Sequence, residues 1–386
     1  MTNRTLTVTL LSDLHIGTGT KLLSGIDWYA HRNGFTYMAD DNTLLDTVVR
    51  RAVDHGQDEI EVVNAITGMK IGELLDTGWL ESDDFSGESS LFRYRLRGEP
   101  ATNEVREQIK TPYGQPYLPG SSLKGALRTV LANAIATEKT PALDKLGRNR
   151  YWTAQSVEAQ LFGAGGPRID ANRDFGRAFQ IGDSAPVEAS ALRLRRAHIY
   201  PTASNTSRGR SRGLDIDLET VAKGTVFTLP MHVPDELLTD RNTAFDQRRQ
   251  LELAHWTERA KFLENLAIYG QEHARLQLLG ELNFFKNRGL QTVNAVYAEL
   301  INRYRTLQPT QFLLPIGWGG GWHTKTLNAH LRKDPKQFDQ LVQDYKLNPT
   351  GKFNAGDTFP KSRHLLRLSN EELGEPLGWC LIDLET

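Results

Sequence analysis

The sequence predicts an α+β fold. Stretches with strand periodicity lie near both ends of the chain and in its middle, and long helical segments lie between them. The regular strand–helix alternation that indicates a parallel sheet is not present. Because 386 residues exceed the length of an average domain, we expect either two units or one core with large insertions.

The N-terminal part begins with a predicted strand at residues 5–11, where leucine and valine alternate with threonine. Residues 12–19 form a polar segment whose glycines favour a turn. Segments 28–30 and 35–38 flank an Asn-Gly pair and predict a hairpin. Residues from about 41 to 110 lack a clear repeat, and we interpret them as a helical or irregular insertion.

The clearest local signal is a helix over residues 121–134, with Ser121 or Ser122 as its N-cap and apolar residues at helical spacing. Residues 236–306 change to a pattern of long helices. Further strand-like segments are 178–181, 193–200, 215–220, 225–232, 364–368 and 378–384.

Composition limits the class of protein. The 46 Lys and Arg residues balance 47 Asp and Glu residues, which excludes a globally basic nucleic-acid binder but not a local basic surface. No apolar stretch approaches the length of a membrane span, and the N-terminus lacks the apolar core of a signal peptide. The single cysteine, Cys380, cannot form an internal disulfide. We therefore expect a soluble cytoplasmic protein with no membrane partner.

The predicted helix at 121–134 is the first candidate binding site. Its N-terminus offers free N–H groups that suit a phosphate, and Lys124 and Arg128 are spaced i, i+4. Gly125 leaves room for a close backbone approach. The alternative is a well-capped amphipathic helix with two solvated cations.

A glycine-rich loop at residues 317–326 is the second candidate. It matches neither the phosphate loop of nucleotide triphosphatases nor the dinucleotide fingerprint. Its backbone N–H groups nevertheless suit an anion, and Trp318 and Trp322 offer flat surfaces for a base. The alternative is a turn anchored by two core tryptophans.

The third candidate is a basic segment at residues 191–212, which contains six arginines and no acidic residue. Leucine and arginine alternate at its start, as in a strand with one charged face. Because like charges repel unless an anion screens them, phosphate binding is favoured over a solvated hairpin tip. The arginines are Arg193, Arg195, Arg196, Arg208, Arg210 and Arg212.

Catalytic constellations are scarce. The histidines and the cysteine show no metal-ligand spacing, so we expect neither a metal nor a cofactor. His15 is a candidate general base or RNA contact, and Asp27 is a candidate acidic residue, although each suits a turn equally well.

Together these segments resemble the RAMP superfamily of CRISPR effector proteins, which are built from ferredoxin-like (RRM-like) units. The matching segments are His15–Gly19, Pro119–Arg128 and Gly317–Gly321. The resemblance implies two such units with helical insertions. Residues 1–235 would form the first, with the insertion at about 41–110 and a basic hairpin at about 191–213, and residues 236–386 the second.

Within this superfamily the chain looks like the family of fifth subunits of type III-A Csm complexes. That family implies a non-catalytic protein that binds and caps the 3′ end of the CRISPR RNA (crRNA) and has crRNA, target RNA and other Csm subunits, especially the adjacent backbone subunit, as partners. The RNA contacts that the resemblance implies are His15, Gly17, Gly19, Ser121, Ser122, Lys124, Arg128, Arg193, Arg195, Arg196, Gly317, Trp318, Gly319, Gly320, Gly321 and Lys325.

Two enzymatic alternatives remain open at this point. A backbone-type RAMP subunit would cleave target RNA with Asp27 and a divalent metal. A guide-processing endoribonuclease would use His15 as its base, although no partner His or Tyr constellation is visible.

Overall fold

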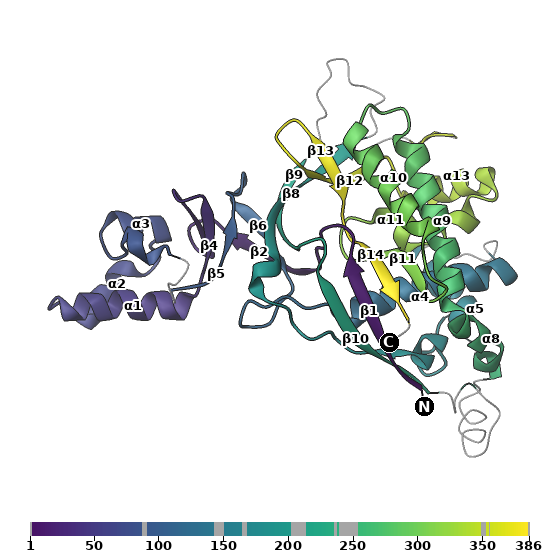
Figure 1. The fold of residues 1–386 in the computed structure, drawn as a ribbon, viewed down its shortest axis with the longest axis horizontal. Helices are drawn as coiled ribbons and strands as arrows, with labels where there is room; N and C mark the ends of the chain where they lie inside the picture. The colour runs from purple at the N-terminus through teal and green to yellow at the C-terminus, as the bar shows by residue number, and fades with distance from the viewer. Residues whose placement is uncertain are drawn as a thin grey trace.

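Two large sheets, a small third sheet and a layer of helices make up the fold (Figure 1). The computed structural model describes residues 2–86, 91–142, 150–163, 168–201, 214–234, 238, 254–348, 353–354 and 356–384. The predicted α+β class is confirmed, because strands and helices segregate into separate layers.

The first large sheet is antiparallel and has β1 at its centre. The alternation that predicts β1 is confirmed, since Leu6 and Val8 are fully buried. Leu6 lies opposite Leu229 of β10, and Val8 lies opposite Ile382 of β14. In spatial order the strands are β11 (Gln311–Pro315), β14 (Trp379–Asp383), β1 (Thr2–Leu10), β10 (Val226–Val233) and β7 (Gln180–Ile181).

The second large sheet carries the predicted basic segment on its strand β8. Its pairs are antiparallel apart from β6 with β9, which are parallel. The turn predicted for residues 12–19 is wrong at its C-terminal end, because β2 already begins at Gly17. In spatial order the strands are β13 (Leu373–Pro376), β12 (Ser362–Arg367), β8 (Leu192–Pro201), β9 (Asp215–Val221), β6 (Glu104–Gln108) and β2 (Gly17–Leu23).

Both large sheets combine strands from early and late in the sequence. β14 pairs with β1, and β12 pairs with β8. Strands from both sides of the predicted boundary at residue 235 therefore pair within the same sheets. The division of the chain into two units at this residue stays a prediction.

Residues 28–97, here called the projecting unit, extend away from the large sheets in Figure 1. The hairpin predicted there is confirmed, but residues 41–110 are not only helical or irregular, because they contain β5 and β6. The unit has a hydrophobic cluster of its own around Tyr37, Val48 and Leu80. Its elements are β3 (Trp28–His31), β4 (Phe35–Ala39), α1 (Asp41–Asp54), α2 (Glu59–Ile66), α3 (Ile71–Asp76), a 3₁₀ turn (Ser82–Asp84) and β5 (Phe92–Arg97).

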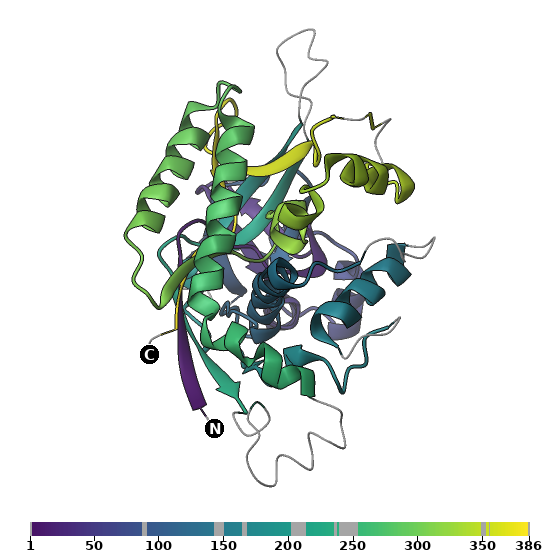
Figure 2. The same cartoon turned by 90° about the vertical axis from the view of Figure 1, so that its right-hand side faces the viewer.

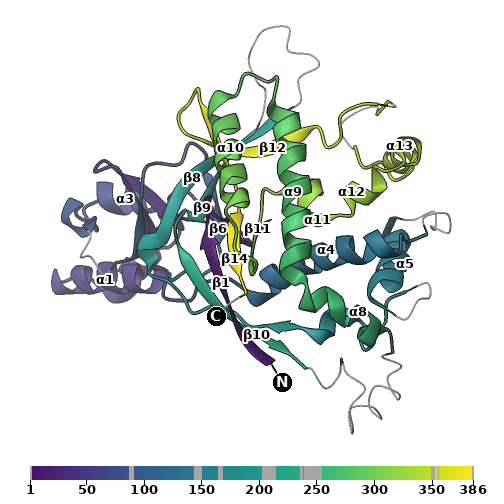
Figure 3. The same ribbon diagram turned by 45° about the vertical axis from the view of Figure 1, so that its right-hand side comes forward.

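Helices cover the opposite side of the molecule from the projecting unit (Figures 2 and 3). The predicted helix is α4, whose apolar face packs on β1 and α8 in the main core. A Cβ on Gly270 of α9 would lie 2.4 Å from the Phe312 ring, so this helix sits directly on β11. The helices are α4 (Gly120–Glu138), α5 (Arg150–Phe162), α8 (Ala254–Glu264), α9 (Leu266–Phe285), α10 (Gln291–Arg305), α11 (Gly321–Lys325), α12 (Asn328–Leu331) and α13 (Pro335–Asp344), with 3₁₀ turns at Phe175–Ala178 and Ala189–Ala191.

The predicted strand at 178–181 is mostly wrong, because a 3₁₀ turn ends at Ala178 and only Gln180–Ile181 pairs. Cys380 is a buried thiol on β14. Across the described ranges, we find no helix with the length and apolarity needed to cross a bilayer.

Candidate nucleic-acid interface

The two predicted glycine-containing loops meet at the ends of the two large sheets. The Trp318 N–H donates to the His15 carbonyl at 2.8 Å. A Cβ on Gly317, whose φ is +72°, would lie 2.5 Å from that same carbonyl, so a side chain does not fit there. Segments about 300 residues apart in sequence therefore form one surface.

His15 holds this junction together from inside. Its ring is buried, Nδ1 lies 2.7 Å from the Glu219 carbonyl, and the ring edge faces Trp318. Burial lowers the pKa of His15 to about 4, so the ring is neutral near pH 7. A buried neutral ring supports the loop, and within the segment His15–Gly19 the residues Gly17, Thr18 and Gly19 are exposed to solvent.

The two tryptophans of the glycine-rich loop are packing residues. Trp318 lies between the His364 ring, at 4.4 Å between centroids, and the Arg106 guanidinium, at 5.1 Å. Trp322 packs on Phe359 and donates its Nε1–H to Asn328 at 3.2 Å. Of the two interpretations, the anchored turn fits better than two free stacking platforms.

The remaining glycines of that loop shape its backbone. Gly319 and Gly321 have φ of +104° and +70°, which favour glycine. Gly320 has an ordinary φ and precedes α11 directly, and a Cβ there would lie 2.4 Å from the Thr324 hydroxyl.

The N-terminus of α4 is partly occupied by an acidic side chain of the same chain. The Gly120 N–H donates to the Asp183 carboxylate at 2.7 Å, and Pro119 rather than a serine is the residue at the cap. The predicted serine cap is therefore wrong. Ser121 is exposed and Ser122 is half-buried, so both hydroxyls still border solvent.

Lys124 and Arg128 differ in their surroundings. Arg128 pairs with Asp174 at 2.7 Å and with Glu158 at 3.5 Å, and its guanidinium stacks on Phe162. Lys124 lies over the Phe179 ring, and no carboxylate of the described residues is within ion-pair distance of its ammonium. Burial lowers the pKa of Lys124 below its ordinary value. Lys124 is thus the cation of this helix that still needs a counter-ion.

Gly125 lies on an open face of α4. No described atom lies within 4 Å of the position that its Cβ would take. It lines a groove of about 570 Å³ between α4, α5 and α11–α13, together with Lys325 of α11. Lys325 is exposed and forms no ion pair with the part of the chain that the structure describes. We call Ser121, Lys124, Gly125 and Lys325 the α4–α11 face.

Two of the three described arginines of the basic segment are engaged by acidic residues from elsewhere in the chain. Arg195 pairs with buried Asp13 at 2.6 Å, and Arg196 pairs with buried Asp217 at 2.9 Å. Because neighbours in a strand point to opposite sides, these two arginines do not share one charged face. The argument that no acid compensates the segment is therefore wrong for these two residues.

Arg193 is exposed, and its guanidinium donates to the carbonyls of Ser190 and Leu192. It keeps its charge without an acidic partner among the described residues. Arg208, Arg210 and Arg212 lie outside the described residues.

Asp27 lies in the turn between β2 and β3, and it is not part of a group of metal-ligating side chains among the described residues. Its carboxylate accepts the Leu23 N–H at 2.6 Å, which is the role of an acidic residue in a turn. Among residues that the structure describes, no group of three His, Cys, Asp or Glu side chains is arranged to hold a metal.

Several residues of the site carried no sequence signal. Arg106 and His364 cover Trp318, yet each lies in a short strand without a motif. Asp13 and Asp217 neutralise two arginines, and only their position beside the sheet reveals this. Asp13 lies two residues before His15 in the same loop, so of these two acids it is the one that a sequence motif could have identified.

Comparisons with known proteins agree with this architecture. The family model of the RAMP superfamily matches residues 7–322. The chain is 31% identical over 109 residues to the "CRISPR system Cms protein Csm5" of Streptococcus thermophilus, and 28% identical over 173 residues to the protein of that name in Mycobacterium tuberculosis strain CDC 1551 / Oshkosh. The matches cover 28% and 43% of this chain but only 29% and 41% of those relatives.

Two solved structures are similar over their whole length. A chain of the cryo-EM structure of a Csm–crRNA–target RNA ternary complex from a type III-A CRISPR-Cas system aligns with a TM-score of 0.69 and 22% identity, covering 100% of both chains. The crystal structure of T. onnurineus Csm5 aligns with a TM-score of 0.64 and 21% identity, covering 98% of this chain and 100% of that chain. At these identities the likeness establishes the fold.

Proposed function

The chain belongs to the RAMP superfamily, and from that membership we propose that it is a non-catalytic, crRNA-binding subunit of a cytoplasmic type III-A Csm complex. In this role it caps the 3′ end of the guide and supports guide maturation and complex assembly. Its partners are crRNA, target RNA and other Csm subunits, including the adjacent backbone subunit. The similarity to Csm5 proteins and to a chain of a Csm–crRNA–target RNA complex supports this choice.

The observation that carries the proposal is the α4–α11 face. Lys124 and Lys325 have no carboxylate partner among the described residues. Gly125 has no side chain, so the backbone of α4 is accessible where it lines the groove together with Lys325. A guide strand is held through its phosphates without sequence preference, so unpaired cations beside an exposed backbone suffice. A mid-helix glycine costs about 1 kcal/mol relative to alanine, which favours a function for its open face.

The other implied contacts have different roles. The loop Gly317–Gly321 leads directly into α11, which carries Lys325, and it also contacts the His15 segment. Gly17, Gly19 and Gly317–Gly321 would contact RNA through their backbones. His15 and Trp318 position that loop, while Arg195 and Arg196 contact RNA only if an incoming phosphate competes with Asp13 or Asp217. Arg193 is the arginine of β8 that reaches a phosphate most easily.

RNA binding by the α4–α11 face is tested with Lys124→Ala/Lys325→Ala. Because each phosphate contact on a single strand contributes about 0.7 to the slope of log affinity against log salt, we expect the double variant to bind a guide-length RNA more weakly and with a slope smaller by about 1.4. Filter binding at several salt concentrations measures both quantities.

The control for this experiment is Lys261→Ala. Lys261 is exposed on α8 and already paired with Glu138 at 2.5 Å, so its loss should leave the slope unchanged. Equal slopes in the double variant and the unmodified protein would refute the assigned face.

The 3′-end role has its own test. A purified complex assembled without this chain should carry guide RNAs with altered 3′ ends, measured by sequencing the bound RNA. Guides of unchanged length in intact filaments would rule this role out.

Target cleavage with Asp27 is the second candidate function, because Asp27 follows the turn at which β3 begins and its side chain is only half-buried. We expect Asp27→Ala in the assembled complex to leave target cleavage unchanged. Loss of cuts at regular spacing would establish the enzymatic function instead.

A further inference from the structure

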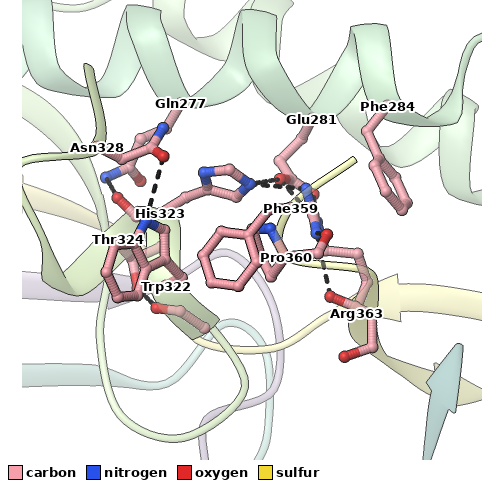
Figure 4. A network of polar contacts seen from close by, with 12 residues as sticks. Gln277, Glu281, Phe284, Trp322, His323, Thr324, Asn328, Phe359, Pro360 and Arg363 are labelled. Carbon is pink, nitrogen blue, oxygen red and sulfur yellow. Dashed lines mark hydrogen bonds and ion pairs between the residues drawn. The ribbon is translucent and has the colours of Figure 1, made fainter. Parts of the chain in front are cut away.

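A polar cavity of about 500 Å³ lies between α9, the α11–α12 segment and residues 358–363 (Figure 4). Only Thr326 also lines the groove at Gly125, so this cavity is a separate space. Its size is that of a site for a small molecule or a single nucleotide.

Its inner wall is a fixed polar network. Arg363 donates from Nε to both carboxylate oxygens of Glu281, at 2.8 and 2.7 Å, and from Nη2 to His323 Nε2 at 2.8 Å (Figure 4). All three side chains line the cavity, and Glu281 is buried. Because His323 accepts from a guanidinium, its ring is neutral. The wall is therefore prearranged rather than assembled by a ligand.

The cavity holds more positive than negative charge. Arg288, Arg332 and Arg363 line it, and Glu281 is the one carboxylate among its described lining residues. The Arg288 Nε donates to the Phe284 carbonyl, which leaves both of its Nη groups without a described partner. Arg332 donates to Asn328 and to the Phe359 carbonyl. Two surplus cations at one opening suit a dianion such as a phosphate.

The rest of the lining suits the edge of a nucleobase. The side chains of Gln277, Asn283 and Asn328 offer donors and acceptors together, as base edges require. Gln277 is buried, and its Oε1 has no hydrogen-bond partner. A buried acceptor without a partner costs free energy, and a base that brings a donor to this wall lets the amide rearrange and satisfy it.

Gly280 keeps the opening clear. It lies inside α9, is exposed and lines the cavity, and no described atom lies within 4 Å of its missing Cβ. Packing therefore does not require a glycine there, unlike Gly270 of the same helix, whose Cβ would meet the Phe312 ring. A helix glycine that packing does not need is explained by the space it leaves for a ligand.

We infer that this cavity binds a nucleotide, with its phosphate at Arg288 and Arg332 and its base edge at the carboxamides of Gln277, Asn283 and Asn328. The ligand is either a free mononucleotide or the terminal nucleotide of an RNA whose end carries a phosphomonoester, because both present a base edge and a dianionic phosphate. This site lies beyond the α4–α11 face and does not require that face to bind RNA.

Calorimetric titration of the full chain with each of the four nucleoside 5′-monophosphates tests the inference. We expect one saturable site for at least one nucleotide, with an affinity at least about tenfold above those of inorganic phosphate and ribose 5-phosphate. Arg288→Gln should weaken binding about tenfold, the effect of losing one charge-assisted hydrogen bond. Gly280→Leu should abolish binding while raising helix propensity, so that its melting temperature does not fall.

The matched control is Arg275→Gln, because Arg275 lies on the same helix and pairs with Glu272 outside the cavity. Binding that is absent for all four nucleotides, that equals binding of ribose 5-phosphate, or that persists unchanged in Gly280→Leu would overturn the inference.

Two further experiments are needed. One distinguishes a free nucleotide from an RNA terminus as the ligand, and the other distinguishes the cavity proposal from the proposal for the α4–α11 face. Competition between a short RNA and the bound nucleotide identifies an RNA terminus as the ligand, and its lack identifies a free nucleotide. Lys124→Ala/Lys325→Ala should keep nucleotide binding while it loses RNA affinity. If RNA affinity is instead unchanged, the α4–α11 proposal fails and the cavity stands.

Discussion

Asp13 connects three parts of the chain through its carboxylate and its backbone carbonyl. Its oxygens accept from Arg195 at 2.6 Å and from the Lys223 N–H at 2.8 Å, while the carbonyl of the same residue accepts from the Gly378 N–H. The carboxylate is buried, whereas Arg195 is partly exposed. A buried charge with a half-exposed partner stabilises the fold mainly by satisfying groups that would otherwise lose water.

We therefore expect Asp13→Asn to lower the free energy of unfolding by about 2 kcal/mol, since a neutral amide cannot balance Arg195. Urea unfolding at neutral pH measures the loss. Glu104→Gln is the control, because its ion pair with Lys21 is solvent-exposed and contributes at most about 0.5 kcal/mol. Equal losses in both variants would show that burial of Asp13 is not the cause.

The glycines and arginines of the candidate site show which of its features the sequence predicts and which it does not. Local motifs located the turn at Gly317 and the open helix face at Gly125, because a backbone turn or an open helix face is encoded by the glycine itself, whereas Gly17 begins a strand and not a turn. Charge counting over 22 residues failed for Arg195 and Arg196, because their partners come from elsewhere in the chain, Asp13 from the loop after β1 and Asp217 from β9. Compensation by distant acids depends on sheet pairing, which a local window does not contain.

Among helices and strands, the sequence prediction succeeded where the apolar periodicity extends over many residues. β1 and α4 each span enough residues for their apolar face to be read directly. β11 and β13 have five and four residues, are mostly buried and have no polar alternation, so their pairing partners alone define them. β5 does alternate, with Phe92, Tyr94 and Leu96 separated by arginines, but it lies inside the stretch interpreted as an insertion. β6 has five mostly polar residues and no clear strand pattern.

The projecting unit is an element-scale structure with its own core, and we expect it to unfold separately from the large sheets. Leu80 is almost fully buried in its cluster, so Leu80→Ala should cost about 2–5 kcal/mol within residues 28–97. Hydrogen exchange should speed up in β3–β5 and α1–α3 while β1, β10 and β14 stay protected.

Leu45→Ala is the matched control, because Leu45 lies on α1 of the same unit with 43% of its surface exposed. Its exchange pattern should equal that of the unmodified protein. Faster exchange in β1 after Leu80→Ala would mean that the unit and the sheets unfold together.

At the scale of the whole molecule, burial of neutral histidines links stability to pH. Burial lowers the pKa of His15 and His273 to about 4 and that of His323 to about 3, each from an ordinary value near 6.5. His15 lies in the loop before β2, whereas His273 of α9 and His323 of α11 both line the polar cavity, so the three report on two parts of the fold. In the unfolded chain all three take up protons near pH 6.5.

The direction of the effect follows from that difference. Between pH 6.5 and about 4 the unfolded chain binds more protons than the folded one, so stability is complete above pH 6.5 and falls as the pH falls. Each histidine contributes roughly 1.4 kcal/mol per pH unit in this window. Glu375 opposes them, because burial raises its pKa, but it is one group against three.

We expect urea unfolding to give similar free energies at pH 7.5 and 7.0 and a clearly lower value at pH 5.5. His15→Gln should reduce the slope between pH 6.5 and 5.5 by about one proton, because glutamine cannot titrate. A stability that stays constant from pH 7.5 to 5.5 would mean that the folded chain accepts these protons. The loop junction at His15 would then be open to water, and the close contact between the His15 and Gly317 segments, on which the proposed RNA surface depends, would not be maintained in solution.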